Sequence, residues 1–184
     1  MHRYLLTGTI AAAALIAAPA VCAAADEFHA IFSGFNEVGP LPGPTAAETG
    51  AILSDGKATL TLNLNRIAQS ITYTLTFSNL TNVTQAHIHF GKIHVPGGVI
   101  VFLCSNLGNG PAGTPACPAS SGTVTGTITP ASVVGPAAQN IAAGNFDGLT
   151  DALNSNTAYG NIHTAKFPAG EIRGEVRRGG KDDD

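Results

Sequence analysis

The sequence places three histidines close together in one short segment. His87 and His89 form a His-x-His pattern, and His94 follows a few positions later. Side chains two positions apart on a β-strand point to the same face, so the imidazoles of His87 and His89 would lie side by side. Neutral imidazole is a common ligand of zinc and copper, and a strand holds two such rings without any ordering of a loop. The pattern therefore predicts a candidate copper or zinc site.

His163 is the candidate third ligand. It lies in Asn161-Ile162-His163-Thr164, in a late predicted strand that could pair beside the strand of His87 and His89. The alternative is a structural role, in which one or more of these imidazoles hydrogen-bonds to backbone or carboxylate groups inside the fold. Spacing alone leaves both interpretations open.

Two glutamates could support such a site. Glu171 shares a predicted strand face with Arg173, so it could form a surface ion pair or orient a ligating imidazole through the second ring nitrogen. Glu37, which follows the first predicted strand, could have either of the same two roles. The sequence does not distinguish between an ion pair and support of a ligating imidazole.

The N-terminus has the pattern of a cleavable signal peptide over residues 1–25. A basic start at His2 and Arg3 precedes an uncharged apolar run and a cluster of alanines, with the expected cut after Ala25. Lipidation at Cys22 is the alternative. The apolar run is shorter than the roughly 20 residues that span a bilayer, and no later segment is long enough. We therefore expect export to the periplasm or the medium, with one domain over residues 26–178 and a polar tail over 179–184.

Cleavage there would leave two cysteines, Cys104 and Cys117, separated by a loop of small and turn-forming residues. In an exported chain such a pair is expected to form a disulfide, although a thiolate metal pair is the alternative. The formal net charge of −3 and the 11% content of charged residues leave no basic surface for nucleic acid.

The rest of the chain reads as an all-β domain, because short β-branched runs alternate with clusters of Gly, Pro and Asn. One short helix is predicted over 146–154, and a Pro- and Gly-rich connection over 34–49. The pattern favours an antiparallel Greek-key sandwich or barrel, with the threonine-alternating strands at 56–64 and 70–78 as neighbours. The predicted strands are 27–33, 56–64, 70–78, 85–90, 98–103, 122–128, 158–164 and 171–177.

Five segments in order together resemble the CHRD domain, the module named after chordin. The resemblance covers about Phe28 to Val176 and implies an extracellular β-sandwich-like module of poorly defined molecular activity. The positions that match the family pattern residue by residue are His87, His89, His163, Glu171, Arg173 and Glu37. The chain departs from the usual form at Gly39-Pro40, where a double proline is common, and in a longer cysteine-bearing loop from His94 to Cys117. The matching segments are Phe32–Val38, Tyr73–Leu80, Ala86–Gly91, Asn161–Thr164 and Phe167–Gly174.

Three functions remain in view. The first is a non-catalytic module that binds copper or zinc through His87, His89 and His163, with Glu171, His94 or Glu37 in support. The second is an adhesion, matrix or protein-interaction domain with structural histidines. The third is a copper enzyme similar to copper–zinc superoxide dismutase, an analogy of fold level. We expect no enzyme, because the sequence carries no nucleophile elbow and no glycine-rich phosphate loop.

Overall fold

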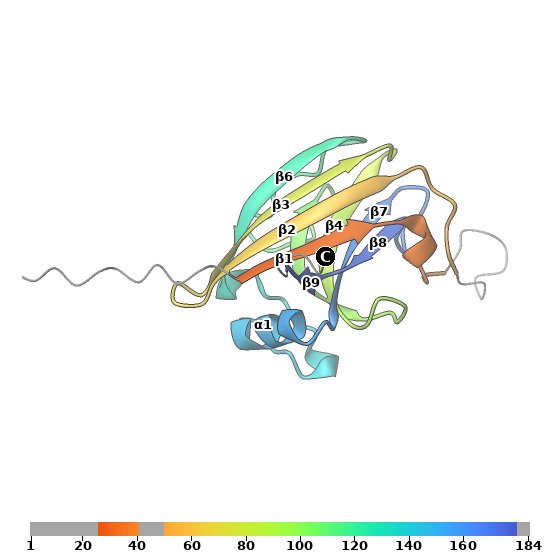
Figure 1. Cartoon of the computed structure of the whole chain (residues 1–184). Coiled ribbons are helices and arrows are strands. Elements are labelled where there is room, and N and C mark those ends of the chain that lie inside the picture. Colours follow the sequence, from red (N-terminus) through yellow and green to blue (C-terminus); the bar gives the residue numbers. More distant parts are fainter. Residues whose placement is uncertain (1–25, 41–49, 180–184) are drawn as a thin grey trace, which may run out of the picture.

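The computed structural model describes residues 26–40 and 50–179 (Figure 1). The predicted signal peptide and residues 180–184 of the predicted tail lie outside the described residues. In the described ranges, the strands form two antiparallel sheets that pack as a sandwich. The five-stranded sheet has the order β6-β3-β2-β1-β9, and the four-stranded sheet has the order β5-β4-β7-β8.

The five-stranded sheet contains β1 (Asp26–Phe32), β2 (Lys57–Asn65), β3 (Ser70–Ser78), β6 (Gly122–Ile128) and β9 (Arg177–Arg178). Alternation determines its two faces, because Leu60 and Leu62 point into the sandwich while Thr59 and Thr61 point outward. The predicted pairing of the two threonine-alternating strands is confirmed, with Thr61 of β2 opposite Thr74 of β3.

The four-stranded sheet contains β4 (Val83–Phe90), β5 (Gly98–Ser105), β7 (Ala158–Thr164) and β8 (Ile172–Glu175). Its inner side chains, among them Ala86, Ile88 and Ile162, belong to the same hydrophobic core as the leucines of the other sheet. The predicted disulfide is present, and it joins Cys104 in β5 to Cys117 in the following loop. A disulfide that closes a loop of this length stabilises the fold by about 3 kcal/mol in the loop-entropy model.

In the described part of the chain, one α-helix, α1 (Phe146–Asn154), accompanies three short 3-10 turns: η1 (Gly34–Asn36), η2 (Pro130–Ser132) and η3 (Ala137–Gln139). The predicted bounds of the helix are confirmed. The side chain of Asn145 caps its first turn by accepting a hydrogen bond from the Gly148 N–H at 2.9 Å. The helix lies near β9, below the sandwich in Figure 1. No helix among the described residues is long and apolar enough to cross a membrane.

The strand predicted over residues 171–177 is wrong as a single strand. The chain instead crosses from one sheet to the other there, since β8 pairs with β7 and β9 pairs with β1. Val176, between them, is fully buried and donates its N–H to the Ala158 carbonyl. This crossing joins the two sheets along one edge of the sandwich.

The connection after β1 also links the sheets. Ser33 forms an isolated antiparallel bridge with Arg173 in β8, and η1 follows at once. The segment from Gly34 to Gly39 therefore leaves the five-stranded sheet and runs beside the four-stranded one. Glu37 reaches the outer face of the four-stranded sheet by this route, as its contact with Arg173 shows.

Candidate metal centre

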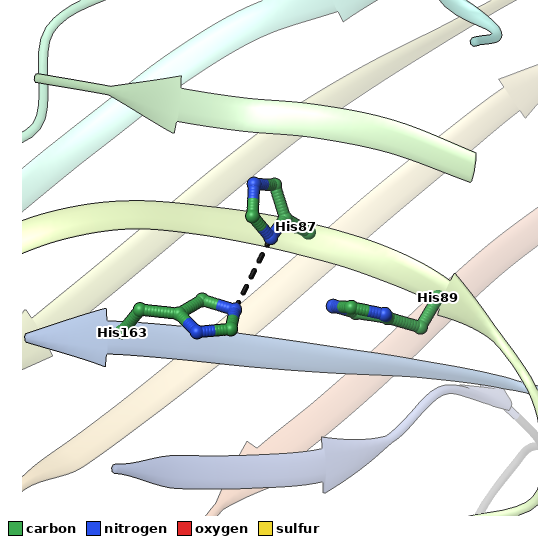
Figure 2. Close-up of side chains that lie close together, drawn as sticks. All are labelled: His87, His89 and His163. Atoms are coloured by element: carbon green, nitrogen blue, oxygen red, sulfur yellow. Dashed lines mark hydrogen bonds between the residues drawn. The ribbon is translucent and has the colours of Figure 1, made fainter. Parts of the chain in front are cut away.

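The three predicted histidines lie together on the outer face of the four-stranded sheet. Because Ala86 and Ile88 point into the core, the alternation of β4 places His87 and His89 on the opposite face. The neighbouring strand β7 pairs antiparallel with β4, so that Gln85 is opposite His163. Figure 2 shows the three imidazoles directed toward one another from these two strands.

The distances between the rings suit a shared ligand. One ligand nitrogen from each histidine lies within 4.8 Å of the other two. Nδ1 of His87 is 3.2 Å from Nε2 of His163 (Figure 2). Zinc–nitrogen bonds of about 2.0–2.1 Å at a tetrahedral angle would hold two ligand nitrogens about 3.3–3.4 Å apart. The observed separation fits two imidazoles bound to one ion. It equally fits a hydrogen bond in which one of these two nitrogens carries the hydrogen and the other accepts it.

Backbone carbonyls determine the tautomers of two of the rings. Nδ1 of His89 lies 2.9 Å from the Gly97 carbonyl, and Nδ1 of His163 lies 3.0 Å from the Pro168 carbonyl. A carbonyl oxygen only accepts, so both Nδ1 atoms carry a hydrogen and both Nε2 atoms carry a lone pair, which in His163 faces Nδ1 of His87. Metal-bound histidines are oriented in this way, by hydrogen bonds from the ring nitrogen that does not bind the metal.

Two ring nitrogens in the cluster are buried without a partner. Nε2 of His87 and Nε2 of His89 have no hydrogen-bond partner among the described residues. An unsatisfied buried polar atom costs about 1–3 kcal/mol, so such atoms call for a ligand or a functional role. For His89, the free atom is the same Nε2 lone pair that the tautomer leaves available.

Burial keeps the three rings neutral. Burial, followed by the nearby imidazoles of His163 and His89, lowers the pKa of His87 to about 2. Burial lowers the pKa of His89 to about 4, although its bond to the Gly97 carbonyl opposes the shift. Burial also lowers the pKa of His163. Near pH 7 all three imidazoles are therefore unprotonated, which is the form that binds metal ions.

Two aromatic rings cover the cluster. Phe102 of β5 meets His87 edge-on, with ring centroids 4.4 Å apart. Tyr159 of β7 stacks flat on His89, with centroids 4.8 Å apart and an interplanar angle of 2°. The Tyr159 hydroxyl accepts the Gly97 N–H at 2.9 Å, which ties the loop carrying Gly97 over His89. These contacts leave the histidines only 3% to 9% exposed although they are on an outer face.

A buried ion pair lies beside the rings. Nη2 of Arg173 donates to Oε1 of Glu37 at 2.7 Å, and Asn161 donates to the other Glu37 oxygen at 2.7 Å. The Arg173 guanidinium also lies over the Tyr159 ring, 4.2 Å from its centroid. Glu37 is thus linked to His89 through Arg173 and the Tyr159 ring.

Gly170 lets the chain approach this network closely. Its φ of +131° is a conformation that L-residues rarely adopt. A Cβ there would lie 2.5 Å from both Oδ1 of Asn161 and Oε2 of Glu37. The same loop carries Pro168, whose carbonyl orients His163. Glycine is required for the loop to fit.

The structure places the supporting candidates away from the rings. Glu171 accepts hydrogen bonds from the hydroxyls of Ser54 and Thr164, both at 2.7 Å, and Arg173 pairs with Glu37 instead of forming the alternative ion pair with Glu171. The reason is position, because Glu171 precedes β8 while the Arg173 side chain lies on the covered outer face. His94 is exposed and borders a cavity with His29. Glu37 contacts none of the three histidines directly.

Sequence reasoning missed Tyr159 and Asn161 as parts of the site. Both share the outer face of β7 with His163, since the three positions alternate along one strand. Tyr159 is opposite His89 and Asn161 is opposite His87 across the β4–β7 pair. The alternation alone could have pointed to them once the pairing of the two strands was assumed.

The fold and this site define a class of protein: an antiparallel β-sandwich with three buried histidines on the covered outer face of one sheet. Residues 28–176 match the family described as the CHRD domain, and the chain belongs to that family. No curated protein and no solved structure shows a significant match.

Proposed function

We propose that the protein is an exported, non-catalytic CHRD-domain module that binds one copper or zinc ion through His87, His89 and His163. The observation that carries the proposal is the buried Nε2 lone pair of His89, without a partner among the described residues, beside the 3.2 Å pair formed by His87 and His163. When bound, the ion would satisfy these nitrogens and join β4 to β7. The chain's own contribution is to orient the rings through carbonyls and to exclude water.

Export is supported by two independent features. The Cys104–Cys117 disulfide suits an oxidising extracytoplasmic compartment. The N-terminal sequence has the charge and apolar pattern of a signal peptide, although residues 1–25 lie outside the described residues. We propose the periplasm or the medium as the destination.

Metal analysis of the protein tests the proposal. The full chain is expressed, and the exported form is purified, stripped with a chelator, loaded with Zn(II) or copper, desalted and analysed by elemental mass spectrometry. We expect one ion per chain. His87→Ala combined with His89→Ala should abolish retention, because two of the three nitrogens are lost.

The matched control replaces the exposed histidines, His29→Ala and His94→Ala, which should leave one ion per chain. Circular dichroism shows whether each variant keeps its β-sheet content. Stoichiometric binding that persists in the folded double variant at His87 and His89 would contradict the proposal.

An extracellular adhesion or protein-interaction role with structural histidines is the second candidate. Two large apolar side chains near the end of β1, Ile31 and Phe35, are 77% and 67% exposed. An exposed apolar patch marks an interaction site when its side chains are contiguous, so these two residues are the positions to test. Absence of metal binding together with concentration-dependent assembly in analytical ultracentrifugation would favour this candidate.

A superoxide dismutase-like copper enzyme has less support. The cluster found in the described residues consists of three histidines without a carboxylate, whereas that enzyme needs a second metal site with an Asp and a bridging His. The absence of superoxide dismutation by copper-loaded protein is the expected result of a direct assay.

A further inference from the structure

The charge around the three histidines distinguishes between the metal ions that the site could hold. The imidazoles are neutral donors, so they bring no negative charge to a bound cation. The charged side chains buried in the described structure are Glu37 and Arg173, and their ion pair carries no net charge. The Arg173 guanidinium lies on the Tyr159 ring that stacks on His89, so the positive partner of this pair adjoins the cluster. The surrounding side chains would therefore not neutralise the charge of a bound cation, which would be buried away from water.

Desolvation penalises a divalent ion much more than a monovalent one. The Born cost of moving an ion out of water rises with the square of its charge, so it is about four times larger for a divalent ion of similar radius. Buried divalent sites usually offset this cost with carboxylates or thiolates. Here one oxygen of Glu37 accepts from Arg173 and the other from Asn161. The two cysteines among the described residues, Cys104 and Cys117, form the disulfide.

The number of donor atoms in the cluster also favours a monovalent ion. Zn(II) in proteins takes four ligands, of which one is water in open catalytic sites, and Cu(II) prefers tetragonal coordination. The cluster offers three nitrogens. The three rings are only 3% to 9% exposed, with Phe102 edge-on to His87 and Tyr159 stacked on His89, so a water ligand has little access to the cluster. Cu(I) has a filled d shell and a single charge, and it accepts three nitrogen donors without a fourth ligand.

We infer that the site selects monovalent copper, Cu(I), over the divalent ions Zn(II) and Cu(II). The inference rests on the proposed metal-binding function, which it makes more specific. Its basis is the combination of three neutral nitrogens, a neutralised neighbouring ion pair and a closed cover.

Competition titrations measure this selectivity on the full-length exported protein. Cu(I) is presented under anaerobic conditions with bicinchoninate as the competing ligand, and Zn(II) and Cu(II) are presented separately with competing chelators of known affinity. We expect one Cu(I) per chain and a dissociation constant at least about 100-fold lower for Cu(I) than for Zn(II). Zn(II) or Cu(II) binding that is stoichiometric and as tight as that of Cu(I) overturns the inference and leaves the proposed function standing. Failure of all three ions to bind overturns both.

A charge variant and a spectroscopic measurement complete the test. His89→Asp adds one negative donor, so it should move the preference at least about tenfold toward Zn(II); an unchanged preference in the folded variant counts against the charge argument. X-ray absorption of the Cu(I)-loaded wild-type protein requires no variant. A shell of three nitrogens is expected, and a fourth donor overturns the inference.

Discussion

The two outer faces of the sandwich differ although both begin from alternating strands. On the five-stranded sheet, outward side chains such as Thr59 and Thr74 are exposed, and buried positions alternate with exposed or half-buried ones along β2 and β3. On the four-stranded sheet, every residue of β7 is buried, including the outward Asn161 and His163. The difference arises from loops, since only the second face is covered.

Three segments supply that cover. The loop after β4 brings Gly97 over His89, the loop before β8 brings Pro168 to His163, and the segment after β1 brings Glu37 to Arg173. Each covering segment contributes a hydrogen-bond acceptor to the polar side chains beneath it. Such pairing offsets much of the free-energy cost of burying polar groups, so this face should be sensitive to single substitutions.

The largest expected effect is at the buried ion pair. Glu37→Gln removes the charge that neutralises Arg173. In the wild-type protein, Nη2 of Arg173 lies 2.7 Å from Oε1 of Glu37, and the Arg173 side chain is only 4% exposed. Breaking one partner of a buried pair costs about 3–5 kcal/mol, because the remaining charge stays buried. Urea unfolding of the purified protein measures this loss.

The matched control is the partly exposed pair between Glu175 and Arg177, 2.6 Å apart. Glu175→Gln should cost less than about 1 kcal/mol, since exposed ion pairs contribute little. Equal losses in the free energy of unfolding for Glu37→Gln and Glu175→Gln would show that an ion pair on the covered face contributes no more to stability than an exposed one.

A second, smaller effect concerns pH in the metal-free protein. The folded state holds the pKa of His87 at about 2 and that of His89 at about 4, whereas both rings titrate near 6.5 when unfolded. The unfolded chain therefore binds more protons, and stability falls as pH decreases below about 6.5. Between pH 7 and pH 5.5 the expected loss is about 1 kcal/mol for each of the two rings. His163 acts in the same direction.

Urea unfolding in the presence of a chelator, repeated across this range, measures the slope. Asp26 does not interfere, because Arg66 lowers the pKa of its carboxyl from an unfolded value of 3.8, so its contribution is lost only at lower pH. A metal-free protein whose stability is constant from pH 7 to pH 5.5 would refute the prediction. It would mean that the outer-face histidines become protonated without unfolding, as on an open face.

The same contrast explains how far the sequence predicted the structure. Where one face of a strand meets solvent, alternation identified both the strand and its inward side, as at Leu60 and Leu75. The sequence also predicted that His163 would lie beside His87 and His89, because these residues alternate on strands that could pair. It could not predict the partner of Arg173, since Glu37 is 136 positions away and reaches it only through the connection after β1.

The crossing at Val176 was missed for a related reason. Alternation continues through residues 171–177, so the pattern gave no sign that the strand changes sheets. Long-range placement of this kind depends on which loops cover which face, and local periodicity carries no information about it.

The smallest effect should come from the open face. Thr74 lies opposite Thr61 and Thr125 in the centre of the five-stranded sheet, and its side chain is exposed. Thr74→Val keeps the β-branched shape that strands favour and removes only a solvated hydroxyl, so the free energy of unfolding should change by less than about 0.5 kcal/mol. Urea unfolding measures this beside Glu37→Gln. A loss above 1 kcal/mol in a monomeric sample would show that the threonine face of the five-stranded sheet is stabilised by contacts of its own. The outer face of the five-stranded sheet could then not be treated as an open face in contrast to the covered one.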